Sequence, residues 1–293
     1  MQGTFKCAPA YFISHGTALH TLDPVSPLLL SLRAEGARAL KEDGLKGVVV
    51  ISAHWSSTPI RVGAAARPAT IHDHPSAYLY SFTHAACGDA AVSATVEQQL
   101  RATGYDVDVQ AERGLDHGAW LALEMLFPDG GVPVVPVSLP AQDSGDAFLR
   151  FGEALAPLRE RGIALVCSGG ATHNQDFFRL QFVTRRLPMG GDDAAVAERR
   201  LAILEGEAAI ERNAPWSVAF DGWLTSTLAR TGPAERNADL LRYTDAPGAA
   251  MSHPEPSHFW PVLVFAGASP TGGADRIASG FQHGLSMSAY RTT

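Results

Sequence analysis

The chain has 293 residues, a formal net charge of −7 and 46% hydrophobic side chains, which is typical of a globular protein and excludes an intrinsically disordered one. No run of basic residues offers a footprint for a phosphate backbone, so nucleic acid is not an expected partner. No apolar stretch approaches the roughly 20 residues that cross a bilayer, and the first residues lack the apolar core of a secretory signal. We therefore expect no membrane partner and a cytoplasmic location.

Four short apolar runs are bounded by turn residues and are rich in β-branched side chains, a pattern that predicts buried strands. These predicted strands are Tyr11–Ser14, Val48–Ser52, Val132–Ser138 and Ile163–Ser168. Apolar residues at helical spacing lie between and after them. They predict helices over Leu28–Leu40, Ala90–Leu100, Trp120–Phe127, Phe148–Leu158 and Trp216–Ala229.

Alternation of strands and helices predicts an α/β fold with a central, mostly parallel or mixed β-sheet and helices on both faces. The stretch 187–212 begins with a glycine-rich breaker and continues with Ala, Leu and Glu, so we expect a helical surface insertion there. No linker or internal repeat divides the chain, and a single domain over 1–293 is the simplest organisation. The widely spaced Cys7, Cys87 and Cys167 form neither a disulfide framework nor a metal-binding pair, and we expect them to be buried.

Three of the 11 histidines follow predicted strands. His15 comes directly after the first strand, His54 is separated from the second by one residue, and His173 lies five residues after Ser168. One such histidine is more often a loop or capping residue. The carboxyl ends of parallel strands share one edge of a sheet, however, so three together favour convergent imidazoles, the usual ligands of Zn, Fe or Cu.

Three further histidine segments carry weaker signals. His117 follows the candidate N-cap Asp116, and its ring is either solvated at a helix start or an acid or base of the site. In residues 252–258, Glu255 or His258 could complete a metal site. The segment His72-Asp73-His74 lacks the rest of the longer metallohydrolase motif, so an exposed loop is preferred and a pocket lining is the second possibility. Motifs of serine hydrolases and nucleotide-binding loops are absent.

Five blocks then carry a family resemblance: ISHG at 13–16, ISAHW at 51–55, GLDHGAW at 114–120, SGGATHN at 168–174 and PSHFWP at 256–261. In this order, and over nearly the whole chain, they resemble the class III extradiol ring-cleavage dioxygenases, most nearly the DOPA 4,5-dioxygenase-type branch. One departure is that residues 254–258 read PEPSH, which places Glu255 three residues before the histidine instead of next to it.

The resemblance implies a single α/β domain with a non-haem metal site that opens the ring of a catechol-type substrate with O2. Fe(II) is the metal expected for activity, and Zn(II) is a possible bound metal. His15, His54 and His258 match the metal-binding positions of the family. His173 matches a histidine described as an acid/base residue or as a ligand, and we assign it to catalysis together with His117, which matches a histidine facing the substrate.

Two other functions use the same residues. A zinc-dependent hydrolase would activate water with these histidines, because zinc lowers the pKa of its bound water to about 7. A dependence on oxygen separates that hydrolase from a dioxygenase. A non-catalytic binding protein would keep the pocket alone, but it has no need of four convergent imidazoles.

Overall fold

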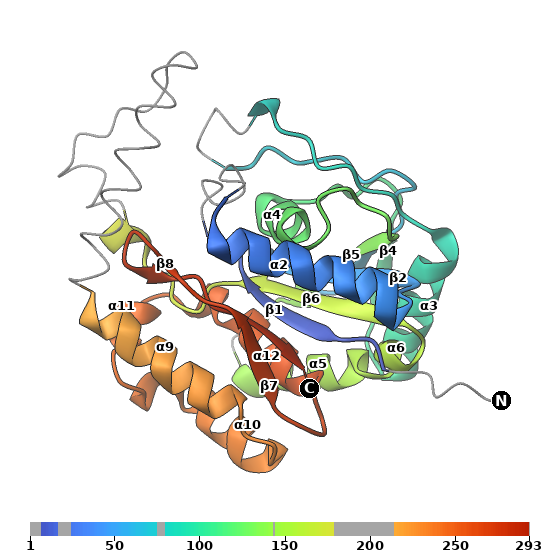
Figure 1. The fold of residues 1–293 in the computed structure, drawn as a ribbon. Helices are drawn as coiled ribbons and strands as arrows, with labels where there is room; N and C mark the ends of the chain where they lie inside the picture. Colours follow the sequence, from blue (N-terminus) through green and yellow to red (C-terminus); the bar gives the residue numbers. More distant parts are fainter. Residues whose placement is uncertain (1–6, 17–24, 75–79, 143, 179–213, 293) are drawn as a thin grey trace.

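The computed structural model describes residues 7–16, 25–74, 80–142, 144–178 and 214–292. One eight-stranded sheet organises them (Figure 1). In spatial order its strands are β4 (Val107–Gln110), β3 (Ile60–Gly63), β5 (Val134–Pro140), β2 (Gly47–Ser57), β6 (Ile163–Gly169), β1 (Ala10–Ser14), β10 (Ala289–Thr292) and β7 (Ala274–Ala278). The four central strands are parallel, whereas β10 and β7 continue the sheet in antiparallel fashion. The predicted mixed, mostly parallel sheet is therefore confirmed.

The central strands form because their side chains are buried on both faces of the sheet. In β2, Val49 and Ile51 belong to one hydrophobic core, and Val48 and Val50 belong to the other. β-Branched side chains pack well on a pleated surface, and alternate residues point to opposite faces. A continuous run of valine and isoleucine is thus what a strand between two helical layers requires.

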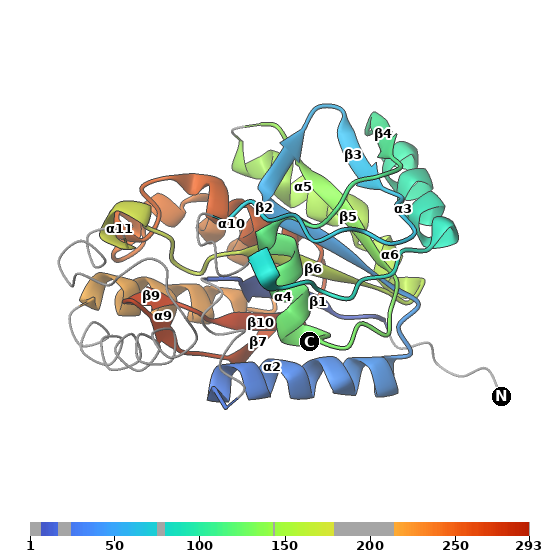
Figure 2. The ribbon, with the colours of Figure 1, turned by 90° about the horizontal axis from the view of Figure 1, so that it is seen from above.

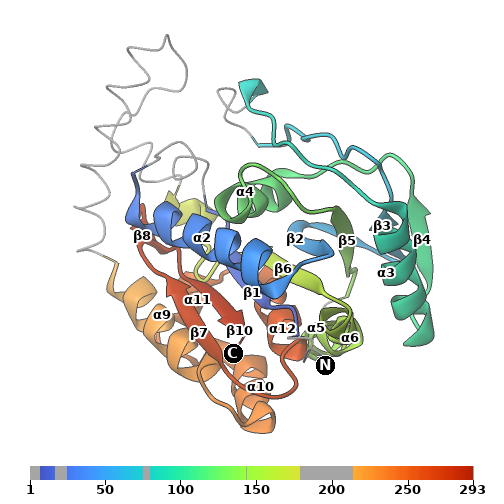
Figure 3. The ribbon, with the colours of Figure 1, turned by 45° about the vertical axis from the view of Figure 1, so that its right-hand side comes forward.

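Helices cover both faces of this sheet. On one face, α2 (Pro27–Arg38), which continues as the π-helical turn η1 (Ala39–Asp43), packs against α4 (His117–Leu126) (Figure 2). The other face carries α3 (Ala90–Ala102), α5 (Gly145–Leu155), α6 (Pro157–Glu160) and α12 (Trp260–Gly267). α9 (Pro215–Leu228) packs against β7, and α10 (Pro233–Leu241) packs against α9 and α12 (Figure 3). Short elements complete the chain: η3 (Tyr243–Asp245), α11 (Ala249–Ser252), η4 (Pro256–His258), β8 (Phe281–Gln282) and β9 (Leu285–Ser286).

The predicted helices are all present, with ends shifted by a few residues, whereas the proposed insertion at 187–212 lies outside the described residues. The prediction that the cysteines are buried holds for Cys167 and is wrong for Cys7 and Cys87, which are exposed. Cys7 precedes β1, and Cys87 lies in the segment before α3, so neither belongs to a central strand. None of the described helices is long and apolar enough to cross a membrane.

Strand register brings the carboxyl ends of β1, β2 and β6 to one edge. Ser168 of β6 pairs with Ile13 of β1 on one side and with Ser52 of β2 on the other. His15 directly follows β1. The pairing of β2 with β5 shifts in register between Ile51 and Ser56, within the stretch that contains His54. Such irregularities change the direction in which a side chain points.

Candidate metal centre

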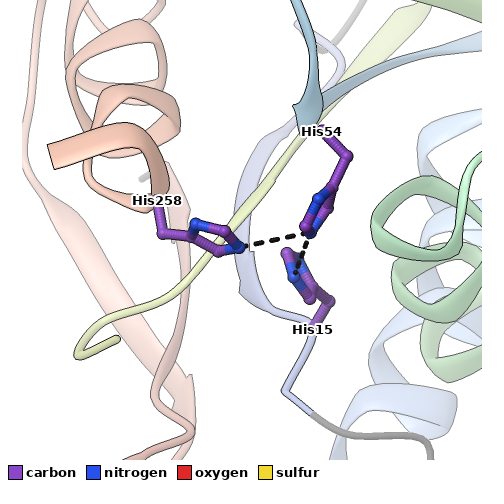
Figure 4. Close-up of side chains that lie close together, drawn as sticks. All are labelled: His15, His54 and His258. Atoms are coloured by element: carbon purple, nitrogen blue, oxygen red, sulfur yellow. Dashed lines mark hydrogen bonds between the residues drawn. The ribbon is translucent and has the colours of Figure 1, made fainter. Parts of the chain in front are cut away.

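Three imidazoles meet at this edge of the sheet. One ring nitrogen each of His15, His54 and His258 lies within 4.8 Å of the others. The Nε2 atom of His54 is 3.3 Å from Nε2 of His15 and 3.2 Å from Nε2 of His258 (Figure 4). His15 directly follows β1, and His258 is the last residue of η4, just before α12. His54 lies within β2, because this strand continues to Ser57 instead of ending at Ser52 as predicted. The strand-end pattern predicted that His15 and His54 converge with His173, whereas the third nitrogen belongs to His258, a residue that only the signal in 252–258 and the family resemblance named.

The amino end of α4 closes over these rings. Asp116 caps the helix by accepting a hydrogen bond from the backbone N–H of Ala119 (3.1 Å), and it also accepts one from the Ser52 hydroxyl (2.6 Å). The next residue after His117 is Gly118, where a Cβ atom would lie 2.8 Å from Cδ2 of His54 and 3.2 Å from Cε1 of His15. Only glycine lets the helix approach the imidazoles this closely.

A short hydrogen-bond chain fixes the tautomer of His15. The Ser168 hydroxyl donates its single proton to the carbonyl oxygen of Gly118 (2.6 Å), so its oxygen accepts from Nδ1–H of His15 (3.0 Å). The neutral ring then carries its lone pair on Nε2, the atom that faces His54. Fixing the second ring nitrogen in this way is how proteins orient a histidine that ligates a metal.

The positions of the three Nε2 atoms suit binding to a metal ion better than hydrogen bonding among themselves. Because Nε2 of His15 is an acceptor, a single N–H on Nε2 of His54 would have to serve both His15 and His258. Ligands bound at about 2.1 Å to one zinc- or iron-sized ion are separated by roughly 3 to 3.4 Å, close to the two distances from His54 to His15 and His258. A divalent cation would take up all three lone pairs at once, so this triad could hold a metal.

Burial keeps these rings neutral. It is the largest cause of the lowered pKa values of His15 and His258, and it lowers the pKa of His54 to about 3, with repulsion from neighbouring imidazoles adding to the effect. Neutral imidazole is the form that binds a metal ion. The site therefore offers three unprotonated ligands at neutral pH.

His173 and His117 pack against the triad without joining it. The ring of His173 lies parallel to that of His258, with centroids 3.5 Å apart and an interplanar angle of 2°. The ring of His117 is 3.9 Å from that of His54. Burial, followed by the charge of His117, lowers the pKa of His173 to about 4. Five imidazoles thus form one cluster at the carboxyl edge of the sheet.

The remaining candidate residues named from the sequence lie outside the triad. Glu255 is exposed and is not part of the triad. His253 is buried, with its Nε2 3.1 Å from the carbonyl oxygen of Ala171. His72 is exposed, as the preferred interpretation had it, but Asp73 and His74 both contact His117, so this segment borders the site. The sequence singled out the segment His72-Asp73-His74, but nothing in it paired Asp73 with His117, which lies 44 residues later.

Residues 9–287 match the protein family described as the catalytic LigB subunit of aromatic ring-opening dioxygenase. The chain belongs to this family. The dioxygenase is 30% identical over 289 residues to 4,5-DOPA dioxygenase extradiol of Beta vulgaris, in a match that covers 97% of this chain and 96% of the relative. It is 29% identical over 263 residues to the protein of the same name in Escherichia coli (strain K12), with 89% and 84% covered.

A solved structure is similar over the same length. The crystal structure of an uncharacterized protein from Escherichia coli K12 matches with a TM-score of 0.68 and 25% identity, covering 98% of this chain and 100% of that one. The extradiol dioxygenase family and the α/β fold predicted from the five sequence blocks are therefore confirmed.

Proposed function

We propose that this dioxygenase opens the ring of a catechol-type substrate with O2, using Fe(II) held by His15, His54 and His258, and that residues 1–293 form one catalytic domain. The observation that carries the proposal is the convergence of three Nε2 atoms beside two further imidazoles. Three protein ligands on one side of a metal leave positions for the substrate and O2. Bound Fe(II) would supply the redox chemistry that joins O2 to the ring.

The protein's own residues would hold and move protons. His173 is neutral at physiological pH and lies beside the triad, so it can accept a phenolic proton of the substrate. His117, next to His54, is the second group that can exchange a proton with the substrate. Burial of the triad under α4 keeps bulk water away from the ligands.

Oxygen uptake tests the proposal. Purified protein is reconstituted anaerobically with Fe(II) and then mixed with an air-saturated catechol, with DOPA first because two relatives are named for it, followed by caffeate, protocatechuate and gallate. We expect one O2 consumed per diol and a yellow ring-opened product. A zinc-loaded sample of the same protein should consume none.

Two variants control this assay. His54→Ala removes one triad ligand and should abolish uptake, whereas Gln98→Ala removes an exposed polar side chain of α3 and should leave it unchanged. Absence of oxygen uptake with all four diols in the Fe(II)-loaded wild type would contradict the proposed function.

A further inference from the structure

Residues 69–73 are fastened to the loop that begins α4. Backbone hydrogen bonds join Ile71 to Leu115 (2.8 Å) and Leu115 to Ala69 (2.8 Å), and the indole N–H of Trp120 donates to the carbonyl oxygen of Ile71 (3.2 Å). Gly114 permits this contact, because a Cβ atom there would lie 2.4 Å from the Ala69 carbonyl oxygen. The position of the next residues along the segment is thereby set.

Asp73 then reaches His117 with one carboxylate oxygen. Its Oδ1 accepts from the backbone N–H of His117 (2.9 Å) and is 3.0 Å from Nδ1 of the same residue. The side chain of His117 is 11% exposed and that of Asp73 is 33% exposed. An ionised carboxylate has no proton to donate, so Nδ1 of His117 must carry the hydrogen of this bond.

We propose that Asp73 is the positioning residue of His117: its carboxylate fixes the ring and holds it in the Nδ1–H tautomer, which leaves the lone pair of the neutral ring on Nε2. A carboxylate that orients an imidazole and selects its tautomer is a recurring device for preparing an acid or base. Both hydrogen bonds are accepted by Oδ1 of Asp73. The bond from the backbone N–H of His117 holds the carboxylate in place, and the bond from Nδ1–H then orients the ring of the same residue. Only the kinetic part of the test rests on the proposed function.

The tautomer is measured directly, without turnover. In metal-free, 15N-labelled protein at pH 8, where an ordinary imidazole is neutral, long-range 1H–15N spectra distinguish protonated from unprotonated ring nitrogens. The signals of His117 are assigned by their loss in His117→Gln. We expect the Nδ1–H form in the wild type and its replacement by the Nε2–H form in Asp73→Ala. Asp73→Asn should keep the Nδ1–H form, because the amide oxygen still accepts.

Kinetics provide the second readout. Asp73→Ala should lower kcat about 10- to 100-fold with little change in KM, as expected when a group that supports a working residue is removed. Asp73→Asn should retain most of the wild-type kcat, because its amide oxygen still accepts the hydrogen bond from His117. If only the negative charge of Asp73 mattered, this variant would be as slow as Asp73→Ala. Glu112→Gln, which removes an exposed carboxylate two residues before Gly114, is the matched control and should match the wild type.

Two results would overturn the proposal: a wild-type His117 in the Nε2–H form, or an Asp73→Ala protein whose tautomer and kcat are both unchanged. The first requires no variant, so it decides the question even if Asp73→Ala fails to fold. If the wild type opens no diol, the proposed function fails, and the spectra alone still decide the role of Asp73.

Discussion

The imidazoles of His173 and His258 are stacked face to face, with centroids 3.5 Å apart. The backbone N–H of His173 donates to the carbonyl oxygen of Ser252 (2.7 Å), and the backbone N–H of Gly170 donates to the carbonyl oxygen of His258 (3.1 Å). The loop that carries His173 is therefore attached to the segment that carries one triad residue. His173 is held beside the triad and is not one of the three convergent nitrogens.

This placement predicts that His173→Ala abolishes ring opening while most of the metal is retained. The expected loss of rate is about 100-fold or more, the range of general acid–base catalysis. Oxygen uptake and metal content are measured on the same sample. Loss of all bound metal in His173→Ala would show instead that His173 is a ligand.

Removing a triad residue should weaken metal binding itself, unlike the loss of His173. His15→Ala leaves two imidazoles and should bind Zn(II) or Fe(II) far more weakly, because one direct bond is lost. Calorimetric titration of metal-free protein measures this affinity, and the rise in Tm on adding metal should disappear in the variant. An unchanged affinity would remove His15 from the metal site.

Ser168→Ala tests the hydrogen-bond chain behind His15. Without the hydroxyl, Nδ1 of His15 loses its acceptor, and we expect metal affinity to fall about 10- to 100-fold. Ser93→Ala is the matched control, since it removes another buried serine hydroxyl, that of Ser93 in α3, which donates to the Gly63 carbonyl oxygen in β3. If both variants bind metal like the wild type, the chain does not orient the ligand.

Gly118→Ala tests the close approach of α4. The new methyl group would lie 2.5 Å from the Ser52 hydroxyl and within 3 Å of His54, so the helix or the imidazole must move. We expect weaker metal binding and a loss of about 1 to 3 kcal/mol in the free energy of unfolding. Gly222→Ala, where a Cβ atom meets nothing within 4 Å in α9, should instead stabilise the protein by about 0.5 to 1 kcal/mol. Metal titration and urea unfolding of both variants measure these two effects. A Gly118→Ala protein with the metal affinity and stability of the wild type would contradict the expectation.

A pH dependence is expected of the ion-pair cluster on α2. Burial alone would raise the pKa of Glu35, but hydrogen bonds from Arg38 and Tyr11 and the charge of Arg291 hold it below its ordinary value of 4.5. A carboxylate with a lowered pKa stabilises the folded state above the unfolded pKa, and this contribution is lost as the pH falls through the folded pKa.

Glu35→Gln should therefore lower the free energy of unfolding by about 1.5 to 3 kcal/mol at pH 7, the usual range for hydrogen bonds to a charged group. The difference from the wild type should stay constant down to about pH 5 and shrink below about pH 4.5. Urea unfolding of both proteins across this range, with a metal chelator present, measures it. A difference that grows at low pH would contradict the assignment.

Sequence alone predicted the four strands at the centre of the sheet. The central strands β1, β2, β5 and β6 are continuous apolar runs and were predicted, whereas β4 and β7 are short and partly exposed, and no strand was predicted there. Helix α12 was also missed. It is buried on nearly every side, so its residues show no amphipathic period that distinguishes a helix from a strand.

The site divides in the same way. His15 could be predicted because it directly follows an apolar run, which is a local property of the sequence. His54 was predicted to follow a strand but lies within β2, which continues to Ser57. The residues that hydrogen-bond to the site histidines could not be predicted. Ser168 is 153 residues from His15 along the chain, and Asp73 is 44 residues from His117. Such contacts follow from strand register and loop docking, which no short motif records.

The order of elements along the chain has a consequence for biosynthesis. His54 and His258 are 204 residues apart, and β1, which leads to His15, pairs with β10 near residue 290. A ribosome releases His15 and His54 long before their third partner exists, and contacts of this separation form late in folding. The growing chain therefore has no complete triad until His258 has emerged, so a metal ion held by all three imidazoles would have to bind after the synthesis of nearly the whole described chain.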